Sequence, residues 1–222
     1  MNPVLKFESE FIEEAVYQIL SSNKQLAESF NTEIKPNDLK QKIEETFEKL
    51  GFHRAFESLI SEFPILKNSE LTISVKRVFS LGREGSRLAE GESKVVILGL
   101  LPKRLLNHAL FEIFLRQELL RASDMLDPLF GYEPMFNGDR CADEESARRF
   151  LTLWNLYISV RLGYEGVQIY DSSDKDERLF QITYFHLQKG VKYPSEIADQ
   201  LNAKGYLTQG DLLQLVNQIT TK

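Results

Sequence analysis

The sequence contains few of the residues that form disulfides or hold metals: one cysteine and three histidines occur among 222 residues. The single Cys141 excludes an internal disulfide framework and fits a reducing compartment. His53, His108 and His186 are far apart along the chain and show no metal-ligand spacing. We therefore expect no metal ion or other cofactor.

Positive charge and long apolar runs are also scarce. The chain has 33 acidic and 27 basic side chains, a net charge of −6, which argues against general affinity for nucleic acids or anionic membranes. No apolar stretch approaches the length of a membrane span. Residues 1–14 carry acidic side chains where a signal peptide needs a basic start. A cytoplasmic location without nucleic-acid or membrane partners is expected.

Periodicity divides the chain into three predicted regions: 1–64, 65–165 and 166–222. The first has apolar residues at helical spacing, and Gly51 is a natural end for its middle helix. A third short helix, over 54–63, is expected to stop at Pro64. The region is expected to form a helical layer.

The central region begins with a change to a period of two, in which Leu71, Ile73 and Val75 share one face. A continuous apolar strand is predicted over 94–100. Between them, the glycine-rich stretch 81–93 is interpreted as a hairpin loop, since it leads into a strand and not into a phosphate-binding helix. A small, mostly antiparallel sheet follows from this interpretation.

A helix over 102–126 is apolar nearly all round, which predicts that it is buried. Polar side chains on such a helix are costly unless they are paired. Gln117, Arg121 and Asp124 nevertheless follow one another at spacings of four and three residues, which places them on one face. We interpret this polar stripe as the wall of a cleft.

The segment Gln117-Glu118-Leu119-Leu120-Arg121 resembles the zinc-binding helix of zincin metallopeptidases, H-E-x-x-H, with both histidines replaced. A third ligand follows six residues after the second histidine in some zincins, and Asp127 takes that position here, whereas Asp124 stands where those enzymes have glycine. The apolar strand ahead of the helix is also in the zincin order. The resemblance covers residues 70–135.

The resemblance implies a zincin-like domain that has lost zinc and peptidase activity. A guanidinium at Arg121 cannot release its proton to bind a metal. Glu118 would be a vestigial catalytic residue, and Gln117, Arg121, Asp124 and Asp127 would line a residual cleft for a peptide or protein partner. Arg121 is expected to stand in for the lost cation by pairing with Glu118 or Asp127.

Three other interpretations stay open. Glu118 and Arg121 are also what an ordinary helix with an i,i+3 ion pair would contain. An active hydrolase with a metal held by carboxylates and one remote histidine is a second alternative. A structural or oligomerisation protein that acts through its helical ends is the third.

The remaining segments are expected to complete an α+β protein with helical N- and C-terminal regions. The connection 127–143 is rich in Pro, Gly and aromatic residues, and an amphipathic helix is predicted over 144–162. Its Arg148, Arg149 and Arg161 have two alternative roles: they reach the carboxylates between Asp124 and Asp127, or, as we expect, they are solvated or locally paired. Residues 175–222 are predicted to form three helices, the last capped by Thr208, without the basic surface of a DNA-binding helix-turn-helix.

Overall fold

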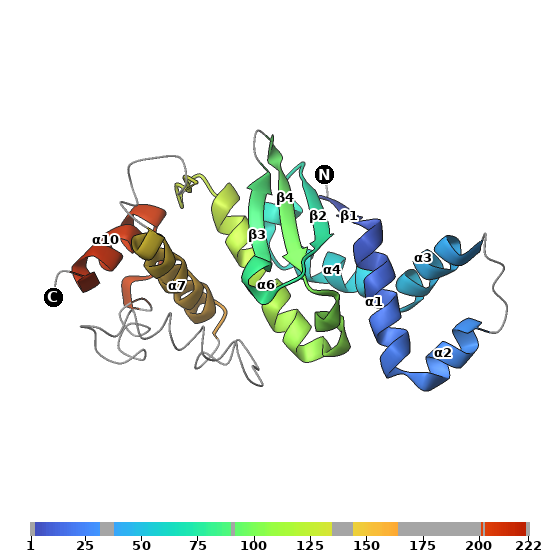
Figure 1. Cartoon of the computed structure of the whole chain (residues 1–222). Helices are drawn as coiled ribbons and strands as arrows, with labels where there is room; N and C mark the ends of the chain where they lie inside the picture. Colours follow the sequence, from blue (N-terminus) through green and yellow to red (C-terminus); the bar gives the residue numbers. More distant parts are fainter. Residues whose placement is uncertain are drawn as a thin grey trace. The chain divides into compact units, whose positions relative to one another are not determined.

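The computed structural model describes residues 3–31, 38–89, 92–134, 144–163, 201 and 203–220. Its contacts divide the chain into two compact units, residues 1–122 (unit 1) and 123–222 (unit 2). The predicted division at residues 64 and 165 stays a prediction. The α+β class is confirmed, because the chain combines one small sheet with many helices (Figure 1).

The sheet of unit 1 is mixed. Its strands are β1 (Val4–Phe7), β2 (Thr72–Arg77), β3 (Gly85–Ala89) and β4 (Glu92–Leu100), in the spatial order β1-β2-β4-β3. The β1–β2 and β2–β4 pairings are parallel, and only β3–β4 is antiparallel. The prediction of a mostly antiparallel sheet is therefore wrong.

The error has its origin in the stretch 81–93. It was predicted to be a hairpin loop between two strands, but it contains a 3₁₀ turn, η2 (Leu81–Arg83), and the whole of β3. The chain passes from β2 to the far edge of the sheet and returns as β4 between the two. The hairpin is thus the β3–β4 pair, and β2 and β4 run parallel.

After β1, which was not predicted, the N-terminal region is helical as predicted, but its described residues form five helices around an aromatic core where three were expected. These are α1 (Ser9–Ser22), α2 (Lys24–Asn31), α3 (Leu39–Lys49), α4 (Phe52–Ser61) and α5 (Pro64–Lys67). Gly51 ends α3 with a φ of +77°, as predicted. Pro64 begins the short helix α5 as well as ending α4. Rings from β1, α1, α3 and α4 meet in a cluster of Phe7, Phe11, Phe47 and Phe56.

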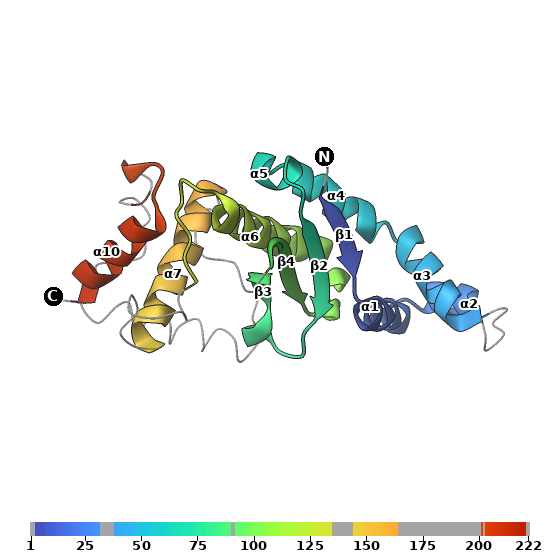
Figure 2. The same ribbon diagram turned by 90° about the horizontal axis from the view of Figure 1, so that it is seen from above.

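The predicted helix over 102–126 is two helices, the 3₁₀ helix η3 (Pro102–Leu106) and α6 (His108–Leu126). They separate at Asn107, whose side-chain oxygen accepts a hydrogen bond from Leu110 N at 3.2 Å and so caps the start of α6. Phe111 of α6 packs against Phe52 and Phe56 of α4. The helices α4 and α6 lie on the same face of the sheet (Figures 1 and 2).

Unit 2 contains the end of α6, the helix α7 (Glu144–Arg161) and the helix α10 (Gln209–Thr220). Trp154 of α7 stacks on Phe130, with ring centroids 5.3 Å apart. The predicted cap of the last helix is confirmed: Thr208 Oγ1 accepts a hydrogen bond from Asp211 N at 3.1 Å, and Asp211 accepts one from Thr208 N. Most of the loop 127–143 and of the predicted helices after residue 175 lies outside the described residues.

Among the residues that the structure describes, no helix is both long and apolar enough to cross a membrane.

Candidate functional site

Residues 117–125 of α6 are buried except for the partly exposed Arg121, in agreement with the predicted burial of this helix. Gln117 and Glu118 are each 5% exposed, and the apolar Leu119 and Leu120 beside them are also buried. The Arg121 side chain retains 13% of its exposure. Polar groups therefore lie in the interior at the segment that resembles the zincin motif, and they need partners there.

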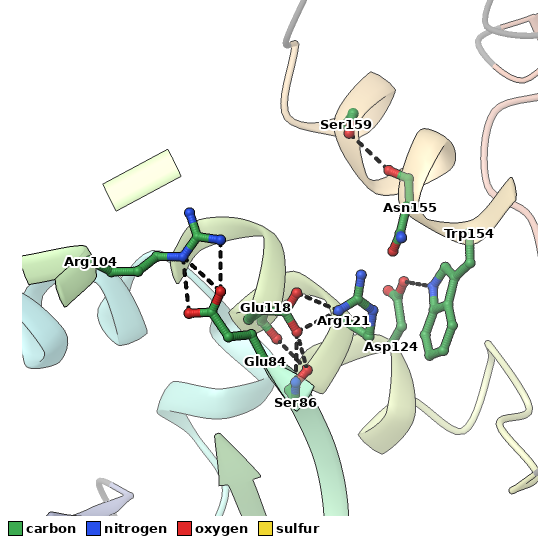
Figure 3. A network of polar contacts seen from close by, with 9 residues as sticks. All are labelled: Glu84, Ser86, Arg104, Glu118, Arg121, Asp124, Trp154, Asn155 and Ser159. Atoms are coloured by element: carbon green, nitrogen blue, oxygen red, sulfur yellow. Dashed lines mark hydrogen bonds and ion pairs between the residues drawn. The ribbon is translucent and has the colours of Figure 1, made fainter. Parts of the chain in front are cut away.

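The Glu118 carboxylate has partners of two kinds in unit 1 (Figure 3). Arg121 Nη1 contacts both of its oxygens from the next turn of α6. Ser86 of β3 donates its backbone N–H to Glu118 Oε2 at 2.7 Å, and the Ser86 hydroxyl lies 3.0 Å from the same oxygen. The negative charge is thus matched by a guanidinium and stabilised by donors from the sheet.

Gly85, the residue before Ser86, lies beside this carboxylate at the start of β3. Its φ of +134° is a backbone conformation that side-chain-bearing residues rarely adopt. A Cβ atom at this position would lie 3.4 Å from Glu118 Oε2 and 3.8 Å from Arg121 Nη1. These distances are ordinary van der Waals contacts, so it is the backbone angle that requires glycine at this position.

Glu84, the residue before Gly85, forms a second buried ion pair. The Glu84 side chain is 3% exposed, and Arg104 of η3 binds its two oxygens at 2.7 and 3.0 Å. Glu84 Oε1 also accepts the backbone N–H of Leu101 at 2.9 Å. Two buried acid–arginine pairs, Glu84 with Arg104 and Glu118 with Arg121, therefore lie at the start of β3 (Figure 3).

The two predicted site residues in unit 2 have partners of their own. Asp124 is 2% exposed and accepts hydrogen bonds from Trp154 Nε1 at 3.0 Å and Arg161 Nη1 at 2.6 Å. Asp127 Oδ2 accepts a hydrogen bond from the Tyr206 hydroxyl at 2.8 Å. The expectation that Arg161 is solvated or locally paired is wrong, because the end of α7 carries it to a buried carboxylate on α6.

Burial affects the titration of this second group. Desolvation raises the pKa of Asp124 above its ordinary value of 3.8, although Arg161 and Trp154 act in the opposite direction. The pKa of Tyr206 is also raised, first by burial and then by its hydrogen bond to Asp127. The Arg161 guanidinium lies over the rings of Tyr157 and Tyr206, at 5.2 and 5.8 Å from their centroids.

The donor set at Glu118 does not fit the zinc ion that the resemblance implies. Zinc takes imidazole, thiolate or carboxylate ligands. The positions of the two zincin histidines hold an amide at Gln117 and a guanidinium at Arg121, and the latter has no lone pair to offer. Within the described part of the chain, no group of three or more His, Cys, Asp and Glu side chains is placed to hold a metal ion.

The sequence identified the residues on α6 but missed their partners. Ser86, Gly85, Glu84 and Arg104 belong to a stretch that was interpreted as a loop or to a helix valued only for its apolar side chains. Two signals for these partners are present in the sequence. One is the run Glu84-Gly85-Ser86, an acidic residue followed by two small ones. The other is Trp154, because a buried indole N–H needs a hydrogen-bond acceptor. Pairing between segments 20 or more residues apart has no local sequence pattern.

Comparison with known proteins gives no relative: the chain matches no family model, no curated protein and no solved structure.

Proposed function

We propose that this chain is a non-catalytic, zincin-like protein in which an internal ion pair occupies the place of a metal site, and which acts by binding a peptide or protein partner. The observation that carries the proposal is the contact of Arg121 with both oxygens of the buried Glu118. Arg121 stands at the second histidine position of the motif, and Glu118 stands at the catalytic one.

The chemistry of the two residues supports the loss of catalysis. In a zincin the glutamate must be available to take a proton from the metal-bound water. Here the Glu118 carboxylate is held by Arg121 and by two donors of Ser86. A carboxylate whose oxygens are occupied in this way is a poor general base, and a fixed positive charge beside it repels a divalent cation.

The partner that we propose is a peptide or a protein and not a nucleic acid. The acidic balance of the chain disfavours nucleic acid, and its low cysteine content fits the cytoplasm. A peptide or protein would be the natural ligand of a domain that once bound peptides.

Zinc analysis of the purified protein tests the proposal. Zinc is measured per chain, without chelators or an affinity tag, in the wild type and in Gln117→His/Arg121→His. The expected result is a wild type without zinc and a double variant that binds close to one zinc per chain, because the variant restores two imidazoles one turn apart beside Glu118.

A matched control separates a rebuilt site from two histidines on any helix. Gln41 and Glu45 are exposed and lie four residues apart on α3, so Gln41→His/Glu45→His creates the same spacing elsewhere. Stoichiometric zinc in the wild type would contradict the proposal and support an active hydrolase. Equal zinc in the two double variants, or none in either, would show that residues 117–121 are an ordinary helical segment.

A further inference from the structure

The N–H group of Ser86 points away from the sheet although Ser86 is part of it. β3 is the end strand in the order β1-β2-β4-β3, with β4 as its one neighbour. Ser86 is paired in register with Leu98 of β4. Its single backbone hydrogen is nevertheless directed to Glu118 Oε2, 2.7 Å from the nitrogen. The donor therefore lies on the outer edge of β3.

An outward donor on an edge strand is normally satisfied by water or by another strand. In this protein the acceptor is a carboxylate oxygen from α6, 2.7 Å from the Ser86 nitrogen, which is within the hydrogen-bond range of the carbonyl oxygen of an added strand. Ser86 Oγ lies 2.9 Å from the Glu118 backbone oxygen, which holds the strand and the helix together at the same point. Arg121 compensates the negative charge of the buried Glu118 carboxylate.

We propose that Glu118 closes the outer edge of β3 and so prevents this strand from pairing with β3 of a second copy of the chain. The partner excluded is a second copy because the edge of each copy presents the same donors and acceptors, and two antiparallel copies complement each other about a two-fold axis. The inference concerns association of the protein and does not depend on a zincin ancestry.

Hydrogen exchange at the Ser86 amide, combined with solution mass over a range of protein concentrations, tests the inference. In the wild type, this amide is expected to exchange roughly 100-fold or more slowly than in an unstructured chain. Glu118→Gln keeps an oxygen acceptor and is expected to stay protected and monomeric. Glu118→Ala removes the acceptor, so we expect Ser86 exchange to accelerate at least tenfold at low concentration and the mass to rise with concentration.

Glu112→Ala is the matched control, because Glu112 lies on the same helix and pairs on the surface with Arg116. It is expected to change neither Ser86 exchange nor mass. A monomeric Glu118→Ala protein at every concentration, or one that keeps Ser86 protected, overturns the inference. If Glu118→Ala does not fold, Glu118→Gln decides: a protected Ser86 in a monomer supports the inference, and an unprotected Ser86 overturns it.

Discussion

Trp154, the one tryptophan of the chain, donates its indole N–H to Asp124 at 3.0 Å. The same carboxylate binds Arg161 through its other oxygen at 2.6 Å. Because Asp124 is buried, one side chain connects α6 to α7 and places a charge next to the only indole of the protein. Fluorescence of Trp154 therefore reports directly on this group.

Removal of the Asp124 carboxylate should destabilise unit 2. Asp124→Ala leaves the indole N–H without its acceptor and Arg161 without its counter-charge. The Arg161 side chain retains 27% of its exposure, so we expect a loss of roughly 2–3 kcal/mol, below the range for fully buried pairs. Urea unfolding followed by Trp154 emission measures the loss. A change under about 0.5 kcal/mol would contradict the importance of the pair.

The raised pKa of Asp124 predicts a pH effect of definite sign. Because the folded state holds this proton more tightly than the unfolded state, the contribution of Asp124 to the free energy of unfolding is largest below pH 3.8. This contribution falls as the pH rises from there through the raised folded pKa, and it is constant above it.

The measurement is a titration of Trp154 emission in the folded protein, with Asp124→Asn as the control. A transition with its midpoint above 3.8 is expected in the wild type and should be absent from the variant. A midpoint at or below that value would mean that the pairing with Arg161 outweighs the burial.

Gly85 should tolerate no side chain. Gly85→Ala places a side chain on a strained φ, and we expect a loss of roughly 1–3 kcal/mol. Gly82 is the control, because it has no positive φ and nothing lies within 4 Å of the Cβ that an alanine would add. Thermal unfolding of both variants gives the comparison. Equal losses would show that the positive φ at Gly85 is not a constraint.

The capping box at Thr208 and Asp211 should contribute to the docking of α10. Thr208→Ala removes the oxygen that accepts Asp211 N–H, which typically costs about 1 kcal/mol. Thr208→Ser keeps the oxygen and should cost less than half as much. Urea unfolding by Trp154 emission reports both variants, and equal losses would exclude the cap as the cause.

Much of the fold follows from local patterns, and the parts that do not are long-range. The alternation of Leu71, Ile73 and Val75 identifies β2, and Gly51 and Thr208 mark helix ends, because period, φ and capping are properties of neighbouring residues. Strand order has no such local signature. The short β3, with one charged side chain and a glycine, therefore has the sequence pattern of a loop.

The candidate site shows the same limit. The burial of Gln117, Glu118 and Asp124 was predictable from an α6 that is apolar on all sides. Their grouping into one site was not: Glu118 has partners in unit 1, whereas Asp124 and Asp127 have theirs in unit 2. Which arginine pairs with which carboxylate depends on helix packing, and so the sequence favours a solvated or locally paired Arg161 over the contact with Asp124 that the structure shows.

The unfolding free energy of Arg121→Ala, measured alone and in combination with Glu118→Gln, tests most directly whether Arg121 compensates the buried charge of Glu118. Unfolding in denaturant is followed by circular dichroism, which reports on the helices of both units. We predict that Arg121→Ala costs about 3 kcal/mol or more, because it leaves a buried carboxylate uncompensated, and that adding Glu118→Gln recovers at least about 1 kcal/mol by removing that charge. A loss below about 1 kcal/mol, with no recovery in the double variant, would contradict the account and make the pair an ordinary surface contact of α6.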